Sequence, residues 1–209
     1  MADLLERIED GIAWLTLNRP DRLNAFSPAM LQALGEVLQR LGGDGEVGAV
    51  VVTGAGRGFC AGGDVKTMET RANQGFEERV EGLRRMHQLP LLLRTIPKVV
   101  IAMVNGPAVG AGLGLAMACD LRIAGRSARF GTGFAGVGYS GDFGGSWSLT
   151  RLVGRQRRAS SIFSATSSMP LRRLRSASST ASSRMKRCSA KPPPSPAASP
   201  TARGSLTAT

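Results

Sequence analysis

Two runs of apolar, largely β-branched residues place the strongest constraint on the fold of this chain. Residues 47–53 and 99–104 contain almost no polar side chains. Strands with one solvated face alternate polar and apolar residues, whereas continuously apolar strands are typical of parallel sheets covered on both faces. Neighbouring parallel strands need a long connection, usually a helix. The runs therefore predict a buried parallel sheet in an α/β architecture.

The segments around these runs carry the helical signals that such connections need. Helices are predicted over residues 28–41, 65–93 and 109–119. The first follows Ser27, a favourable N-cap, and is ended by Gly42 and Gly43. The third is rich in alanine and glycine, which lets it pack closely, and the Asn-Gly-Pro sequence at residues 105–107 predicts a turn before it.

Shorter strands are predicted at both ends of this region. Two alternating apolar runs flank Asp10 and Gly11, a pair that favours a tight hairpin turn. Further strands are predicted over residues 120–124 and 128–130. Strands and helices thus alternate along the chain, as expected of an α/β protein.

The last quarter of the chain differs in composition from the rest. Residues 156–209 carry eight Arg, two Lys, 14 Ser and six Pro but no Asp or Glu. Residues 1–155 keep 17 basic and 15 acidic residues, so the tail holds most of the net charge of +12. We predict a folded body over 1–155 and a disordered tail over 156–209, because the tail has little apolar surface to bury. A basic tail can contact phosphates, but Phe163 is its only aromatic residue, and we do not expect nucleic acid as a partner.

The N-terminal segment, the lengths of the apolar stretches and the cysteine spacing argue against an exported, membrane-spanning or metal-binding protein. The first 11 residues lack the basic start and apolar run of an export signal, and no apolar stretch is long enough to cross a bilayer, so we expect a cytoplasmic protein with no membrane partner. Cys60, Cys119 and Cys188 lack metal-ligand spacing, which predicts reduced thiols and no metal site. His87 is the only histidine, and we expect a surface or helix-end role for it.

Four segments together carry a family resemblance. They are LNRPDRLNAFS at 17–27, GRGFCAGGDV at 56–65, AMVNGPAVGAGLGLAMACDLRIA at 102–124 and ARFGTGFAGVGYSGDFGGSWSLTRLVG at 128–154. In this order and spacing they resemble the enoyl-CoA hydratase/isomerase (crotonase) family, which implies a crotonase-like spiral of ββα units. A dinucleotide site is the alternative for the glycine string, but it requires an acidic residue about 20 positions on, where this chain has Phe130.

The resemblance implies an acyl-CoA thioester substrate whose enolate is stabilised by two backbone N–H donors. They are expected at Ala61 and at Ala111, the latter near the start of a helix whose dipole adds to the effect. Gly62, Gly63 and Gly110 would let the backbone approach the ligand closely, although glycines also serve tight turns. No cofactor is expected, because CoA is part of the substrate.

The resemblance also places the CoA moiety along the first two motifs. Contacts with it are expected from the three glycines just named and from Arg22, Leu23, Ala25, Asp64 and Val65. An arginine beside a phosphate is favourable, but Arg22 would equally serve as a solvated loop charge. The family assembles as trimers or hexamers, so the resemblance implies the same self-association unless the altered tail impairs it.

Departures from the family decide which reaction is expected. Family hydratases add water with two glutamates, and the matching positions here are Gly114 and Phe134, which cannot activate water. Asp142 instead matches the carboxylate with which several family isomerases move a proton. One carboxylate suffices for that reaction, because it takes a proton from one carbon and returns it to another. The alternative role for Asp142 is to cap a helix that begins near Phe143.

Isomerisation of an unsaturated acyl-CoA is therefore the leading interpretation. Hydration, acyl-CoA binding without turnover, and nucleic-acid binding by the tail are the alternatives. The family continues past residue 154 with helices that complete subunit contacts, and this chain does not. One permitted choice of codons for residues 159–173, read from the third base, encodes ELYLLGDKLDAAEA, which resembles the missing helix and turn. We therefore predict that the tail is a frameshifted reading and that assembly is impaired.

Overall fold

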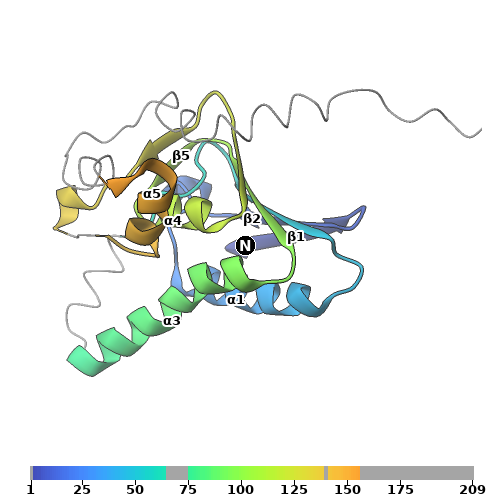
Figure 1. Cartoon of the computed structure of the whole chain (residues 1–209), viewed down its shortest axis with the longest axis horizontal. Coiled ribbons are helices and arrows are strands. Elements are labelled where there is room, and N and C mark those ends of the chain that lie inside the picture. The colour runs from blue at the N-terminus through green and yellow to red at the C-terminus, as the bar shows by residue number, and fades with distance from the viewer. Residues whose placement is uncertain (1, 65–74, 139–140, 156–209) are drawn as a thin grey trace, which may run out of the picture. The chain divides into compact units, whose positions relative to one another are not determined.

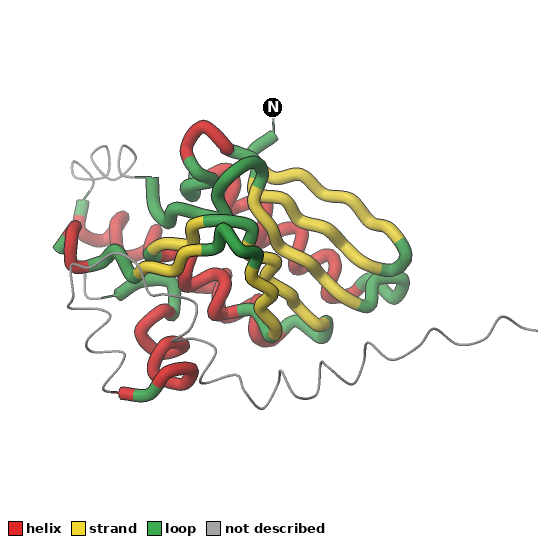
Figure 2. Tube along the Cα trace, turned by 90° about the horizontal axis from the view of Figure 1, so that it is seen from above, coloured by secondary structure: helices red, strands yellow, loops and turns green. Residues whose placement is uncertain are grey.

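The computed structural model describes residues 2–64, 75–138 and 141–155. Its main element is a five-stranded sheet of order β1-β2-β3-β4-β6, shown in Figures 1 and 2. The strands are β1 (Leu4–Glu9), β2 (Ile12–Leu17), β3 (Ala49–Gly54), β4 (Val99–Val104) and β6 (Leu121–Ala124). The first pair is antiparallel and each later pair is parallel. A second, two-stranded parallel sheet pairs β5 (Pro107–Val109) with β7 (Arg129–Gly131).

The first two strands form the predicted hairpin. Asp10 and Gly11 connect them with φ angles of 51° and 72°. Two consecutive left-handed residues give a turn whose twist matches that of the flanking strands, which explains the choice of an Asp-Gly pair.

Two long helices pack beside this sheet. The helix α1 (Pro28–Gly43) begins where Ser27 Oγ accepts a hydrogen bond of 3.0 Å from the N–H of Met30, as its N-cap signal predicts. Its buried face packs on β1 and β2 and consists of Met30, Leu34, Leu38 and Leu41. The helix α3 (Phe76–Thr95) lies beside α1 and adds Leu89 and Leu93 to the core (Figure 1).

Two shorter helices complete the described part. All eight residues of α4 (Ala111–Ala118) are buried, as expected of a helix made of alanine, glycine and leucine. It packs against α5 (Gly145–Val153), against α3 and against β5. Single 3-10 turns lie at η1 (Pro20–Arg22) and η2 (Ala135–Val137).

The predicted α/β architecture is confirmed, and the differences from it are local. Residues 107–109 form β5 instead of only a turn, because they pair with β7. The last helix begins at Gly145 and not near Phe143, since Phe143 and Gly144 have φ angles of 51° and 67°, which a right-handed helix excludes. Residues 65–74, part of a predicted helix, lie outside the described residues, as does the tail predicted to be disordered. Among the helices that the structure describes, none has the length and apolar character to cross a bilayer.

Candidate active site

A cavity of about 1400 Å³ lies between the two long helices. Most of its lining comes from α1 and α3, and the remainder includes Gly63, Asp64, Ala111 and Asp142. These four residues were all predicted to belong to the site. The structure therefore brings the second, third and fourth sequence motifs to one cavity.

Close contact between two glycine-rich loops forms one part of this cavity. Gly62 has a φ of +90°, and a β-carbon there would lie 2.7 Å from the carbonyl oxygen of Val109. A β-carbon at Gly112 would overlap the carbonyl oxygen of Cys60. The loops are joined by a hydrogen bond of 2.9 Å from the N–H of Val109 to that same carbonyl. Glycine is required at both positions because the two backbones touch.

Two backbone N–H groups of these loops belong to residues that line the cavity, Gly63 and Ala111. The carbonyl of Gly62 accepts a hydrogen bond of 2.8 Å from the N–H of Phe26. In a trans peptide the C=O and N–H point in opposite directions, so the N–H of Gly63 points away from Phe26. Ala111 is the first residue of α4, and its N–H points out of the helix N-terminus. Both residues line the cavity.

The predicted donor at Ala61 is not placed in this way. Its N–H donates a hydrogen bond of 2.9 Å to the carbonyl of Leu23, and Ala61 is not among the described residues that line the cavity. Gly63, by contrast, lines the cavity, and the carbonyl of the peptide that joins it to Gly62 is the one bonded to Phe26. Gly63 was predicted as a CoA contact and not as a donor, because the sequence does not reveal that the N–H of Ala61 is bonded within the protein.

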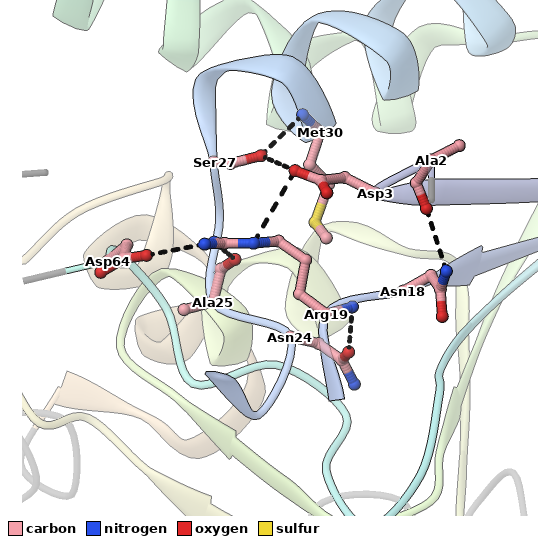
Figure 3. Close-up of polar contacts among 9 residues, drawn as sticks. All are labelled: Ala2, Asp3, Asn18, Arg19, Asn24, Ala25, Ser27, Met30 and Asp64. Atoms are coloured by element: carbon pink, nitrogen blue, oxygen red, sulfur yellow. Dashed lines mark hydrogen bonds and ion pairs between the residues drawn. The ribbon is translucent and has the colours of Figure 1, made fainter. Parts of the chain in front are cut away.

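An arginine that the sequence reading missed holds the first two motifs together. Figure 3 shows that the guanidinium of Arg19 donates to the carbonyl of Ala25 at 2.7 Å and to Asp64 Oδ2 at 3.0 Å. Its backbone N–H donates to Asn24 Oδ1 at 2.8 Å, and Asn24 is fully buried. The only available signal was that Arg19 belongs to the first motif. Asp64 thus has a partner within the protein, which ties the loops that face the cavity.

The other predicted CoA contacts lie around these loops. Arg22 is exposed, Ala25 is buried, and Leu23 is partly buried with its carbonyl bonded to Ala61. Gly110, with a φ of +56°, precedes α4. None of these four is among the described residues that line the cavity, and Val65 lies outside the described residues.

Asp142 enters the cavity from the loop before α5. Its Oδ1 accepts a hydrogen bond of 2.7 Å from the N–H of Phe143 and lies 2.7 Å from Nε2 of His87 on α3. The alternative capping role is not what the structure shows, because Gly144 occupies the N-cap of α5 and no side chain caps that helix. His87 is exposed, as the predicted surface role requires, although it does not lie at an end of α3. This histidine lines the cavity and contacts Asp142, a partner 55 residues away that no local pattern reveals.

The positions of the two family glutamates are filled differently. A β-carbon at Gly114 would lie 2.9 Å from the carbonyl oxygen of Phe143 and 3.0 Å from its β-carbon. The segment that carries Asp142 therefore occupies the space into which a longer side chain at Gly114 would extend. Phe134 is buried, with 6% of its surface exposed.

The cysteine beside the glycines has no nucleophilic character. Burial raises the pKa of the Cys60 thiol to about 12, and a hydrogen bond from the backbone of Gly62 opposes only part of that rise. The thiol is therefore neutral at ordinary pH, which agrees with the absence of a predicted catalytic role. Within the described ranges, no group of His, Cys, Asp and Glu has the arrangement of a metal site.

Comparisons with known proteins place this arrangement in a family. A model of the enoyl-CoA hydratase/isomerase family matches residues 7–173, past the boundary predicted at residue 155. The chain is 41% identical to a 1,2-epoxyphenylacetyl-CoA isomerase of Escherichia coli over 75% of its length, and 41% identical to a short-chain-enoyl-CoA hydratase of Clostridium acetobutylicum over 78%. It covers only 60% and 61% of those two relatives.

Solved structures agree with the crotonase-like fold. An enoyl-CoA hydratase from Polaromonas sp. JS666 superposes with a TM-score of 0.78 at 34% identity, over 83% of this chain and 67% of that one. The family match covers well over half of the sequence, and the fold matches independently. This chain therefore belongs to the enoyl-CoA hydratase/isomerase family of enzymes.

Proposed function

We propose that this chain binds an unsaturated acyl-CoA thioester and moves its double bond, with Asp142 as the proton carrier. The supporting observation is that Gly63 and Ala111, whose backbone N–H groups are the proposed donors, line one cavity together with the carboxylate of Asp142. Preorganised N–H donors stabilise the negative charge that develops on a thioester oxygen when its α-carbon loses a proton. Removing one such donor typically costs about 3 kcal/mol of transition-state stabilisation.

The proton balance needs one carboxylate and no co-reactant. The Asp142 carboxylate takes a proton from the α-carbon of a 3-enoyl-CoA, and the electron pair of that C–H bond delocalises into a dienolate. The N–H groups of Gly63 and Ala111 hold the resulting oxyanion. The acid form of Asp142 then returns the proton to the γ-carbon, which leaves the double bond conjugated with the thioester.

The relatives support both an isomerase and a hydratase, so our choice between the two reactions rests on the residues of the site. One relative is a CoA-thioester isomerase and another is a hydratase at the same identity. Water addition in the family uses two carboxylates, whereas Gly114 and Phe134 stand at those positions here. Isomerisation is therefore the favoured reaction, hydration is the second candidate, and acyl-CoA binding without turnover is the third.

Self-association is part of the same proposal. Val99 on β4 and Leu121 and Ile123 on the adjacent β6 are between 47% and 51% exposed. Clustered apolar side chains at a sheet edge are typical of a surface that another chain covers. A cytoplasmic location also remains our expectation, supported by free thiols at Cys60 and Cys119.

The test compares Asp142→Asn with Glu36→Gln, which alters another carboxylate that lines the cavity. We expect Asp142→Asn to lower kcat for a 3-enoyl-CoA by about 10²–10⁴-fold and to leave thioester affinity within a few-fold. Glu36→Gln should change neither. Equal activity in wild type and Asp142→Asn, or rapid water addition to crotonyl-CoA by the wild-type chain, would overturn the proposal.

A further inference from the structure

The contact between His87 and Asp142 joins the only histidine of the chain to the proposed proton carrier. His87 lies on α3 and Asp142 on the loop before α5, and Nε2 and Oδ1 are 2.7 Å apart. Both residues line the large cavity, and their side chains are 46% and 22% exposed. His87 on α3 therefore contacts the carboxylate of Asp142, which lies on a different element, the loop before α5.

Two groups meet the same oxygen of Asp142. Oδ1 accepts the N–H of Phe143 at 2.7 Å and faces Nε2 of His87 at 2.7 Å. A carboxylate oxygen has two lone pairs, and two donors on one oxygen fix the rotation of the carboxylate about its Cβ–Cγ bond. Oδ2 is then the oxygen that takes the proton from carbon.

We propose that His87 is a positioning residue that donates its Nε2–H to Asp142 Oδ1 throughout the reaction; this inference rests on the proposed function. Oδ1 stays an acceptor both in the carboxylate and in the acid that carries the substrate proton on Oδ2. His87 thus orients the carrier in both states and neither gains nor loses a proton. Which ring nitrogen of a histidine carries hydrogen is set by the partners of the two nitrogens, so the proposal predicts the Nε2–H tautomer.

A purely structural link between α3 and the Asp142 loop is the competing explanation. A partly exposed pair of this kind contributes little to stability, so thermal unfolding alone does not separate the two roles. The tautomer shows whether the hydrogen bond is made, and the effect on turnover separates the two roles.

The first experiment uses the single histidine as its own probe and needs no turnover. The full chain, without affinity-tag histidines, is labelled with ¹⁵N-histidine, and its ring nitrogens are followed by NMR across the titration of the ring. We expect the neutral ring to be the Nε2–H tautomer, Asp142→Asn to shift its nitrogens, and Glu36→Gln to leave them in place. An Nδ1–H tautomer, or identical spectra in wild type and Asp142→Asn, would overturn the proposal.

The second experiment separates positioning from packing. His87→Leu removes the donor but keeps bulk, and we expect kcat for a 3-enoyl-CoA to fall about tenfold with KM and Tm close to wild type. His87→Gln can still donate and should recover most of the loss. Glu77→Gln, at an exposed position of α3 that is not among the described residues lining the cavity, should have no effect. Unchanged kcat in His87→Leu, or no recovery in His87→Gln, contradicts the positioning role.

Failure of this inference is distinguishable from failure of the proposed function. If Asp142→Asn isomerises the substrate as fast as wild type, Asp142 is not the carrier, whatever the histidine spectrum shows. If Asp142→Asn is inactive while its histidine spectrum equals that of wild type, the carrier stands and the role of His87 is refuted.

Discussion

The two sides of the cavity are built from different parts of the polypeptide. On the donor side, which we define as Gly62, Gly63, Ala111 and Gly112, backbone packs on backbone and no side chain carries the chemistry. On the proton side, defined as His87, Gly114 and Asp142, a carboxylate is held by a side chain from a distant helix. The geometry of the donor side therefore depends on having glycine at the positions of closest backbone contact. The geometry of the proton side depends on contacts between particular side chains.

This difference predicts unequal tolerance to substitution. A backbone contact has no freedom to relax, because neither partner has a rotatable group to move away. A side-chain contact can be lost or replaced while the fold persists. Donor-side changes should therefore act mainly on stability, and proton-side changes mainly on turnover.

The largest expected effect comes from Gly112→Ala on the donor side. The added methyl group would overlap the carbonyl oxygen of Cys60, so one of the two loops must move. We expect the free energy of unfolding, measured by urea denaturation, to fall by about 3 kcal/mol or more. Gly43→Ala is the matched control, since a β-carbon there meets nothing within 4 Å. Equal losses in the two variants would contradict the backbone contact.

Gly114→Ala should have a smaller effect on stability and a larger relative effect on turnover. Its β-carbon would lie 2.9 Å from the carbonyl oxygen of Phe143, next to Asp142, so the loop that holds Asp142 must shift by a few tenths of an ångström. We expect a stability loss of about 2 kcal/mol together with a reduced kcat at unchanged thioester affinity. Wild-type kcat in a destabilised Gly114→Ala protein would show that the position of this loop does not control proton transfer.

The smallest effect concerns how the free energy of unfolding depends on pH through the thiol of Cys60, whose carbonyl packs against the donor side. Burial raises the pKa of Cys60 from 9.0 to about 12, and burial does the same for Cys119. Between these values the unfolded thiol ionises and the folded thiol does not, so stability is complete below pH 9 and falls as pH rises. The slope approaches about 1.4 kcal/mol per pH unit for each thiol, and the loss reaches about 1.4 kcal/mol per thiol by pH 10.

The thiol contribution is measured by comparing wild type with Cys60→Ala. Urea denaturation between pH 8.5 and 10.5 gives the free energy of unfolding at each pH. We expect its slope against pH to be smaller in the variant by the contribution of one thiol. An identical slope in both proteins would mean that the thiol of Cys60 is not buried in the folded protein.

Much of the framework could be read from local patterns. The Asp-Gly hairpin, the Ser27 cap of α1 and the apolar strands β3 and β4 follow from turn chemistry, capping and hydrophobic periodicity, and all are present. The start of α5 was misplaced because the left-handed conformations of Phe143 and Gly144 leave no such pattern. Gly63, Asp64, Ala111 and Asp142 were singled out through the order of the motifs, and they meet at one cavity.

The sequence by itself determined the α/β fold, the family and the positions where only glycine fits, because these depend on short-range preferences and on motif order. Only the tertiary structure decided that Gly63 lines the cavity while the N–H of Ala61 bonds to the carbonyl of Leu23, since that contact depends on how two separate loops pack. The pairing of His87 with Asp142 was likewise decided by packing. Its two members lie 55 residues apart and meet only because α3 and α4 pack together beside the loop before α5.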